Sequence, residues 1–456
     1  MVMKDKKILV VGLGVSGMAC IKGLSKLGAE IYVYDGSSRE KLSEKLEELN
    51  GISAKYYFGD EEFDVNDIDF AIKSPGIKYE TDIIQKLIDK NKKIISDIEA
   101  AYLVTEGTIV SISGTNGKTT TTTLIGEIVR ESGKKYKVTG NIGYGMFLDS
   151  LNAEKGEILV AETSSFQLAG TYEYKPHISI LTNITPDHLD FHHTLENYIE
   201  AKFKNVINQD ENDFAILNYE DEAIRRFSDK IKAKKIFFSS ERELEEGVFV
   251  QNGKIIYREN GKNTVIMEAH DIFIPGKHNL ENALAAAGSA IALNIEPEVI
   301  QHILKEFKGV EHRLEYSGEY KGIKFYNDSK GTNPDASIKA VQGIEKPIIL
   351  IAGGYDKKSQ YDEFISSFDG KVKVLILLGQ TADDIEKCAR KYGFTNIYRV
   401  QNMDEAVKKS FELAVEGDNV VLSPACASWG MYPNYEVRGR DFKERVKYYG
   451  GCTKGQ

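Results

Sequence analysis

One glycine-rich loop that carries a lysine is the part of this sequence best suited to chemistry. The loop SGTNGKTTT runs from Ser113 to Thr121, after the apolar stretch TIVSI and before a segment with helical periodicity. Glycines let backbone N–H groups turn around phosphate oxygens, and the helix that follows presents its positive end. Lys118 would neutralise the outer phosphates, and Thr119 would offer its hydroxyl to Mg²⁺. The pattern predicts a nucleoside triphosphate site of variant form, because the standard motif has glycine where this chain has Ile112.

Phosphoryl transfer also needs acidic or imidazole groups near the metal. Glu162 ends the stretch EILVAE and His188 follows HISILTN, so both should lie at the sheet edge where α/β proteins bind ligands. The same positions also suit a helix-capping carboxylate and a loop histidine with local hydrogen bonds. His188, His192 and His193 have the i, i+4 spacing of a zinc site, but no H-E-x-x-H glutamate accompanies them, which argues against zinc.

A second glycine motif, GLGVSG, lies near the start of the chain from Gly12 to Gly17. Asp35 ends the next apolar stretch, where dinucleotide-binding folds hold ribose hydroxyls. The motif indicates NAD or another nucleotide with equal weight, because it specifies only backbone amides for a phosphate and a carboxylate for a sugar. A nucleoside diphosphate sugar satisfies both requirements.

Parallel sheets are needed to position these loops. Alternation of strand and helix recurs three times along the chain, which predicts α/β domains with largely parallel sheets. We expect a Rossmann-like N-terminal domain over residues 1–97, a central P-loop ATPase-like domain over 98–308 and a Rossmann-like C-terminal domain over 309–456. In the central domain, GVFVQNGKIIYRENGKNTVIMEA alternates apolar and polar residues around Asn-Gly turns, which predicts a small β-meander.

The composition is that of an ordinary globular protein, with 41% hydrophobic and 28% charged residues among 456. A formal charge of −10 argues against general binding to nucleic acids or membrane surfaces, which are polyanions themselves. No apolar run approaches the roughly 20 residues of a membrane span, and the chain enters a predicted strand without a secretory signal. The four cysteines, Cys20, Cys388, Cys426 and Cys452, form no C-x-x-C pair, so we expect a cytoplasmic protein.

Eight segments, taken in order, resemble the signature segments of the Mur ligases, which build the peptide stem of bacterial peptidoglycan in the cytoplasm. They are SGTNGKTTT, GNIG, ETSSFQL, TNITPDHLDFH, GKHNLENALAA, EHRLE, NDSKGTNP and LSPACAS, and they span nearly the whole chain. GTNGKT and H-N-x-x-N-A-L-A-A are shared with folylpolyglutamate synthases. ETSSFQL, NDSKGTN and SPACAS, together with the N-terminal glycine motif and SPGI, resemble the members that add D-glutamate.

The resemblance implies an ATP-dependent ligase that adds D-glutamate to UDP-N-acetylmuramoyl-L-alanine, with roles in cell-wall biogenesis, cell shape and cell division. It also implies a monomer that uses ATP and two Mg²⁺ ions. In the family reaction, the L-alanyl carboxylate attacks the γ-phosphate to give an acyl phosphate, and the amine of D-glutamate then attacks the acyl carbon. A carboxylate is a poor electrophile, so phosphorylation supplies the leaving group that it lacks.

The resemblance also implies roles for individual residues of the nucleotide and metal sites. Positions that match catalytic residues are Lys118, Glu162, His188, Lys202 and Asn141. Positions that match ATP contacts are Gly114, Thr115, Asn116, Gly117, Lys118, Thr119, Thr120, Asn279, Asn282, Arg313, Asp328 and Lys330. Metal ligands would be Thr119, Glu162, His188 and Lys202, the last as a carbamate. The pattern around Lys202 is by itself that of a surface helix lysine.

The other two substrates are assigned in the same way. Positions that match contacts to the uridine diphosphate substrate are Val15, Ser16, Asp35, Gly76 and Asn141. Positions that match contacts to D-glutamate are Thr332, Lys357, Ser428 and Tyr435. The segment GGYDKKSQYDEF departs from the familiar form, so Lys358 could replace Lys357 as the carboxylate-binding lysine. Tyr435 stands where the family has phenylalanine.

Rival functions stay open at this point. Folylpolyglutamate synthase and other Mur-type ligases share the ATP loop, but the intact N-terminal glycine motif argues against the synthase. An NAD-dependent dehydrogenase would use that glycine motif and leave the ATP loop without a role. A nucleotide-gated regulatory ATPase would bind and slowly hydrolyse ATP, but it leaves the segment from Arg313 to Thr332 unexplained.

Overall fold

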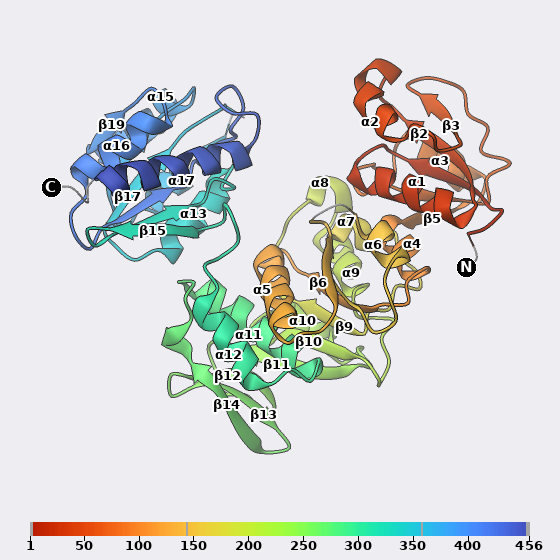
Figure 1. Cartoon of the computed structure of the whole chain (residues 1–456), viewed down its shortest axis with the longest axis horizontal. Coiled ribbons are helices and arrows are strands. Elements are labelled where there is room, and N and C mark those ends of the chain that lie inside the picture. Colours follow the sequence, from red (N-terminus) through yellow and green to blue (C-terminus); the bar gives the residue numbers. More distant parts are fainter. Residues whose placement is uncertain (1–2, 143–144, 357–358, 453–456) are drawn as a thin grey trace. The chain divides into compact units, whose positions relative to one another are not determined.

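The computed structural model describes residues 3–142, 145–356 and 359–452 (Figure 1). The chain forms two compact units. Unit 1 comprises residues 1–272 and 280–305, and unit 2 comprises residues 273–279 and 306–456. Unit 1 contains two β-sheets and unit 2 contains one.

The first sheet consists of five parallel strands in the order β3-β2-β1-β4-β5. This is the strand order of a Rossmann-type sheet, in which β1 is central and ligands bind beyond the carboxyl ends of the strands. The strands are β1 (Lys7–Val11), β2 (Glu30–Asp35), β3 (Ala54–Phe58), β4 (Phe70–Lys73) and β5 (Lys93–Ser96). The helices around it are α1 (Val15–Leu27), η1 (Arg39–Leu42), α2 (Ser43–Glu48), α3 (Asp82–Asp89) and α4 (Asp97–Tyr102).

The second sheet has nine strands in the order β14-β13-β12-β11-β10-β9-β6-β8-β7. Its parallel part is β6 (Thr108–Ser113), β7 (Tyr136–Gly140), β8 (Ile158–Glu162), β9 (Ile178–Leu181), β10 (Phe214–Asn218) and β11 (Lys234–Ser239). Strand β12 (Gly247–Gln251) pairs in parallel with β11 and antiparallel with β13 (Lys254–Glu259), which pairs antiparallel with β14 (Lys262–Glu268). The predicted β-meander is therefore confirmed.

Helices of the second sheet follow its strands in the chain. They are α5 (Lys118–Glu131), α6 (Met146–Leu151), α7 (Ser165–Ala169), α8 (Leu189–His192), α9 (Leu195–Phe203), α10 (Glu222–Ser228), η2 (Ala269–Asp271), α11 (Lys277–Ala292) and α12 (Pro297–Glu306). None of the described helices combines the length and apolar character that crossing a membrane requires.

The third sheet has the order β15-β16-β20-β17-β18-β19 and is parallel except for the pair β15–β16. Its strands are β15 (Glu315–Tyr320), β16 (Ile323–Asn327), β17 (Ile348–Ala352), β18 (Val372–Leu377), β19 (Ile397–Arg399) and β20 (Asn419–Leu422). Its helices are α13 (Pro334–Gly343), α14 (Asp362–Ser366), α15 (Ala382–Lys391), α16 (Met403–Leu413) and α17 (Tyr435–Cys452), and α16 and α17 lie side by side (Figure 1).

One hydrophobic core of unit 1 spans both of its sheets. Ile8 and Ile95 of the first sheet belong to the same buried cluster as Leu159 of β8 and Phe147 of α6. Helices α1 and α6 meet closely, because a Cβ on Gly23 would lie 2.5 Å from the Phe147 ring. This shared core explains why two of the predicted blocks form a single compact unit.

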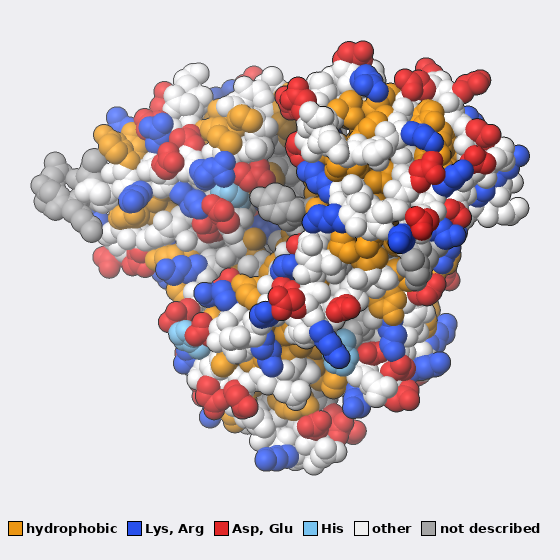
Figure 2. Space-filling view, turned by 45° about the vertical axis from the view of Figure 1, so that its right-hand side comes forward, with side chains coloured by type: hydrophobic (Ala, Val, Ile, Leu, Met, Phe, Trp, Pro, Cys, Tyr) orange, Lys and Arg blue, Asp and Glu red, His pale blue; other side chains and the backbone are white. Residues whose placement is uncertain are grey.

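The α/β class predicted from the sequence is confirmed, with one sheet for each predicted block. The boundaries at residues 97 and 308 stay a prediction. Acidic and basic side chains are interspersed over the face drawn in Figure 2. The net negative charge is therefore not gathered into a single patch on that face.

Candidate functional site

The loop between β6 and α5, residues 114–120, is here called the phosphate loop. Its glycines are required because neighbouring atoms leave no room for a Cβ and because the backbone has a positive φ. Gly114 has φ +146° and Gly117 has φ +82°. A Cβ would lie 1.9 Å from Thr182 Oγ1 at Gly114 and 2.2 Å from Asn282 Oδ1 at Gly117. Side chains at these positions would disrupt the packing, which explains the glycines of the motif.

The segment after β9 holds the phosphate loop in place. Thr182 Oγ1 donates to Asn116 O at 2.6 Å, and Asn183 Oδ1 accepts from Asn116 N at 2.9 Å. The Thr115 amide donates to Asn183 O at 2.8 Å. The loop is thus formed in advance, which lowers the entropy that binding a phosphate would cost.

Lys118 and Thr119 begin α5 directly after the loop. Lys118 Nζ donates to the carbonyl oxygens of Gly114 and Thr115, both at 3.0 Å. The ammonium therefore lies over the loop rather than in solvent. Thr119 is buried, whereas Thr120 is partly exposed. The predicted phosphate-binding group and hydroxyl ligand thus both lie at the N-terminus of α5.

Glu162 ends β8 and is buried next to Asn141. Its Oε1 accepts from Asn141 Nδ2 at 2.8 Å, and the Asn141 amide donates to Glu162 O at 2.7 Å. Its Oε2 is also buried and has no hydrogen-bond partner among the described residues. A buried carboxylate oxygen without a partner is costly unless a cation or proton reaches it. The structure thus brings together two residues that the sequence analysis placed at one site.

Lys202 in α9 is buried, with 1% of its surface exposed, so the expectation of a surface helix lysine is wrong. Its Nζ donates to Gly114 O at 2.7 Å and lies 4.7 Å from the Tyr198 ring centroid. Burial, assisted by the charge of Lys118, lowers the pKa of Lys202 well below its usual value. Attraction from Asp187 and Glu162 opposes this shift. The buried site therefore favours the uncharged amine over the ammonium.

The three histidines near α8 face separate partners. His188 has φ +51°, and its ring centroid lies 4.7 Å from that of Phe166. His192 Nε2 lies 3.0 Å from Ser165 Oγ, and His193 Nε2 lies 3.1 Å from Glu80 Oε1. In the part of the chain that the structure describes, these rings share no common centre for zinc.

The N-terminal glycine loop, residues 12–17, joins β1 to α1. Asp35 ends β2 as expected, and its carboxylate accepts from the Leu13 amide at 2.7 Å and the Ser37 amide at 2.9 Å. Asp35 therefore fixes the loop backbone, and its role at the ribose stays a prediction. Ser16 Oγ donates to the buried Asp97 at 2.6 Å. Burial raises the pKa of Asp97.

Two other positions assigned to the uridine substrate are exposed at the same edge of the first sheet. Val15 begins α1 with 63% of its surface exposed. Gly76 is also exposed, in the turn after β4. Both are accessible to a ligand, and their contacts with the uridine substrate stay a prediction.

In unit 2 the loop before β15 carries Arg313 between two residues with left-handed backbone, His312 at φ +65° and Leu314 at φ +43°. The Leu314 amide donates to Asp328 Oδ1 at 3.2 Å, and the Lys330 amide donates to His312 O at 3.0 Å. Burial raises the pKa of Asp328 to about 7, although Ser423 Oγ donates to its carboxylate. Arg313 thus lies between two residues that hydrogen-bond to Asp328 and Lys330.

Two of the positions assigned to D-glutamate, Thr332 and Tyr435, lie close to Lys330 in unit 2. The Thr332 amide donates to Lys330 O at 2.8 Å, and Lys330 Nζ lies 5.2 Å from the Tyr435 ring centroid. Ser428 is buried, and its carbonyl accepts from the Tyr432 amide at 2.9 Å. Lys357 and Lys358 lie outside the described residues, so the choice between them stays open.

The two asparagines of α11 have different surroundings. Asn282 lies in unit 1, where its Oδ1 accepts from Thr121 Oγ1 at 3.3 Å, beside the phosphate loop. Asn279 lies in unit 2, and its Nδ2 donates to Pro275 O at 2.7 Å. Their assignment to ATP stays a prediction.

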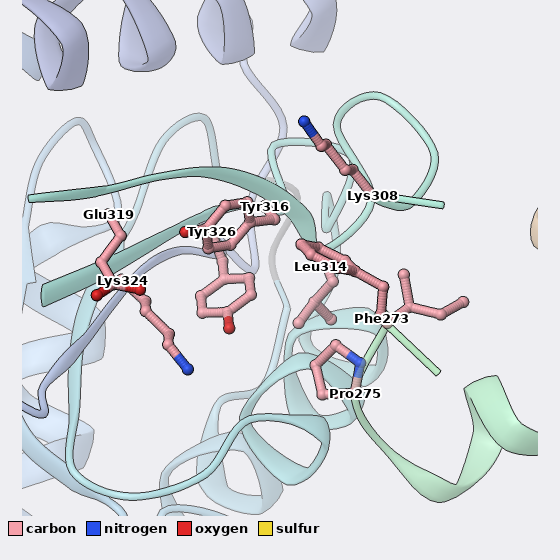
Figure 3. Close-up of a pocket in the computed structure, with 9 residues that line it drawn as sticks. Phe273, Pro275, Lys308, Leu314, Tyr316, Glu319, Lys324 and Tyr326 are labelled. Carbon is pink, nitrogen blue, oxygen red and sulfur yellow. The ribbon is translucent and has the colours of Figure 1, made fainter. Parts of the chain in front are cut away.

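Unit 2 also holds a cavity of about 230 Å³ (Figure 3). Leu314, Phe273 and Pro275 wall one side, whereas the Lys324 ammonium points into the open space. Lys308 points away from the other labelled side chains. The described residues assigned to ATP, uridine or glutamate are absent from its lining.

Sequence reasoning missed an acidic cluster at the base of the Arg313 loop. Lys443 Nζ of α17 pairs with Glu311 Oε1 at 2.8 Å and with Glu315 Oε1 at 2.7 Å. Both acids lie beside the buried His312. Lys443 is thus the cation of this cluster, and its distance in sequence from the loop left no pattern that could reveal the contact.

Family models match three consecutive parts of the chain. The Mur ligase MurD-like N-terminal domain matches residues 6–96, the Mur ligase middle domain matches 112–290, and the Mur ligase glutamate ligase domain matches 312–426.

Curated relatives match along almost their entire length. A UDP-N-acetylmuramoylalanine–D-glutamate ligase from Alkaliphilus oremlandii is 47% identical over 97% of this chain and 98% of its own. A protein of the same name from Clostridioides difficile is 46% identical over 97% of this chain and 99% of its own.

Solved structures share the fold at low sequence identity. UDP-N-acetylmuramate-alanine ligase MurC from Thermotoga maritima is 21% identical with a TM-score of 0.60, and the match covers 97% of this chain and 99% of that one. MurF ligase from Thermotoga maritima, in complex with ADP, is 18% identical with a TM-score of 0.58, and the match covers 99% and 96%.

We predict that His192 makes the stability of this site depend on pH. Burial, and to a smaller degree His188, lowers the pKa of His192 from 6.5 to about 4. Between these values the unfolded chain binds a proton that the folded chain does not, so the free energy of unfolding should fall as the pH decreases. Urea unfolding across this range should give a shallower pH dependence for His192→Gln, which does not titrate.

His193→Gln, at the neighbouring exposed ring, is the matched control and should keep the part of the pH dependence that His192 causes. Equal pH dependence in wild type and His192→Gln would contradict the prediction.

Proposed function

The chain belongs to the Mur ligase family, and we propose that it joins D-glutamate to UDP-N-acetylmuramoyl-L-alanine at the expense of ATP. The observation that carries the proposal is the full-length match to D-glutamate ligases at 46 to 47% identity. The preformed phosphate loop and the buried Glu162 supply a site suited to phosphoryl transfer. This reaction would belong to the cytoplasmic stage of peptidoglycan synthesis.

The chemistry proceeds in two steps. A carboxylate oxygen of the L-alanyl group attacks the γ-phosphorus of ATP, the bond to the bridging oxygen breaks, and ADP leaves. The amine of D-glutamate then attacks the acyl carbon, loses a proton, and expels inorganic phosphate as the amide forms. Lys118 and the loop amides would hold the γ-phosphate in line with the attacking oxygen.

The residues around the phosphate loop fit a magnesium ion. Glu162 offers a buried carboxylate oxygen without a protein partner among the described residues, and Thr119 offers a hydroxyl at the start of α5. Oxygen ligands of this kind suit Mg²⁺, and His188 is the third proposed ligand. When bound, the ion would neutralise the phosphate charge. A second ion would require a further anion at this site.

Lys202 is proposed to supply that anion as a carbamate. Its lowered pKa favours the uncharged amine, and an uncharged amine adds to CO₂ with loss of a proton. The carbamate bears a negative charge. Because Lys118 is positively charged and close by, this site favours an anion over a second cation. Burial would also protect the carbamate from hydrolysis by solvent.

The remaining assignments follow the family resemblance. The N-terminal glycine loop, with Val15, Ser16 and Gly76, is proposed to bind the uridine diphosphate group. In unit 2, Thr332, Ser428 and Tyr435 are proposed for D-glutamate. Tyr435 preserves the aromatic ring of the family position and adds a hydroxyl.

Alternative functions receive less support. Folylpolyglutamate synthase shares the phosphate loop, but residues 6–96 match a MurD-like N-terminal domain. A regulatory ATPase would not need the glutamate ligase domain that matches residues 312–426. An NAD-dependent dehydrogenase is disfavoured by the same two matches.

We predict that phosphate release requires three substrates together. ATP with Mg²⁺ should give phosphate only when UDP-N-acetylmuramoyl-L-alanine and D-glutamate are both present. The L-alanyl carboxylate is needed to form the acyl phosphate, and the amine of D-glutamate is needed to displace the phosphate. A panel with L-alanine, L-lysine and meso-diaminopimelate in place of D-glutamate tests the amino-acid assignment. Phosphate release without the muramoyl nucleotide would indicate a regulatory ATPase. Turnover with a folate would indicate the synthase.

We predict that Lys202→Ala lowers kcat on the order of 100-fold, because the site loses a charge that stabilises phosphoryl transfer. Acetate or propionate should restore part of the activity by placing a carboxylate in the space left by the side chain. Labelled bicarbonate should give a carbamate ¹³C resonance in wild type but not in Lys202→Ala. Lys232→Ala, at an exposed lysine in the loop before β11, is the control and should keep both the resonance and the activity. An unchanged kcat in Lys202→Ala would contradict the carbamate role.

A further inference from the structure

A second lysine is buried in unit 1, at the substrate edge of the first sheet. Lys73 is the last residue of β4, and only 1% of its surface is exposed. Its ammonium makes no ion pair with any carboxylate of the described residues, although the more distant Asp97 attracts it. Burial lowers the pKa of Lys73 to about 8. A cation placed here costs free energy that a methionine of similar length would not.

The Lys73 ammonium stabilises the turn formed by residues 74–77 from its buried side. Lys73 Nζ donates to Ile77 O at 2.8 Å and to Ser74 O at 3.3 Å. The Ile77 amide donates to Ser74 O at 3.1 Å across the Pro75-Gly76 pair, which is a common β-turn sequence. Both carbonyls at the ends of the turn are therefore drawn toward the buried ammonium. The exposed side of the turn, with Gly76, faces solvent.

This turn supports the N-terminal glycine loop. Ser74 Oγ donates to Gly12 O at 2.9 Å, and a Cβ on Gly12 would lie 3.0 Å from Ser74 Cβ. The same carbonyl of Gly12 would lie 1.9 Å from a Cβ on Gly17. A displacement of the turn would therefore be transmitted directly to the loop proposed to bind the uridine diphosphate.

Two aromatic rings cover the other side of the ammonium. Its Nζ lies 5.0 Å from the Tyr79 ring centroid and 5.7 Å from that of Phe191, which belongs to α8 of the second sheet. Phe191 packs on Phe166 at 4.7 Å, and Phe166 lies 4.7 Å from His188. Cation–π contacts are stronger for a desolvated ammonium than for an exposed one. The lysine thus connects the turn of one sheet with the His188 segment of the other.

We propose that Lys73 is a positioning residue for the uridine nucleotide: it holds the turn 74–77, and through it the N-terminal glycine loop, against the segment that carries His188. The inference rests on the proposed function and deepens it. Lys73 acts through two carbonyl oxygens and two ring faces.

The test compares Lys73→Met with wild type and with Lys86→Met, an exposed lysine of α3. Titration calorimetry with UDP-N-acetylmuramoyl-L-alanine should show affinity about tenfold weaker in Lys73→Met, because two hydrogen bonds from a charged donor are lost. The affinity for ATP, whose phosphate loop lies elsewhere, should be unchanged. Lys86→Met should bind both ligands as wild type does. A folded Lys73→Met with wild-type affinity for the uridine nucleotide overturns the proposal.

Hydrogen exchange of the Ile77 amide gives a readout that needs no substrate. Its exchange should be about tenfold faster in Lys73→Met, because the turn loses its inner hydrogen bonds. Failure of wild type to bind the uridine nucleotide would refute the proposed function, and the exchange result would still decide the role of Lys73. If Lys73→Met does not fold, Phe191→Leu replaces it and should weaken uridine-nucleotide binding selectively. Equal weakening for ATP, or none for either ligand, overturns the proposal.

Discussion

The carbonyl oxygen of Gly114 accepts hydrogen bonds from two lysine side chains. The proposed chemistry depends on the short distance that these bonds impose between the two amino groups. Lys118 reaches this oxygen from the start of α5 and Lys202 from α9. Two ammonium groups so close together repel, which favours a neutral or anionic form of one of them. Burial selects Lys202 for that change, because its side chain is enclosed while that of Lys118 is partly exposed.

The parallel sheets provide the rigid frame for these charges. β6 and β8 lie next to each other, so the phosphate loop and Glu162 leave the same edge of the sheet. Glycines at the loop allow contacts that a Cβ would block, and the segment after β9 holds the loop in its binding shape. In the first sheet, Asp35 and Lys73 likewise hold the backbone of two neighbouring turns from the buried side.

Sequence patterns predicted features that depend on neighbours along the chain, such as both glycine loops, the strand that ends in Glu162, and the β-meander. Such patterns could not predict features that depend on tertiary packing. Lys202 has the periodicity of a surface lysine, and only the packing of α9 under the phosphate loop buries it. Lys73 directly precedes a recognisable turn, but its two aromatic partners come from separate elements. The shared core of unit 1 likewise joins segments far apart in sequence.

The proposed reaction requires transfer of the terminal phosphate of ATP to a carboxylate before the amide forms. The most direct measurement places oxygen-18 in the L-alanyl carboxyl group of UDP-N-acetylmuramoyl-L-alanine and analyses the inorganic phosphate released with D-glutamate. We expect one labelled oxygen in the phosphate, because the carboxylate oxygen that attacks phosphorus leaves with it when the amine attacks carbon. Phosphate free of the label, formed together with the amide product, would contradict the acyl phosphate and with it the proposed use of this site.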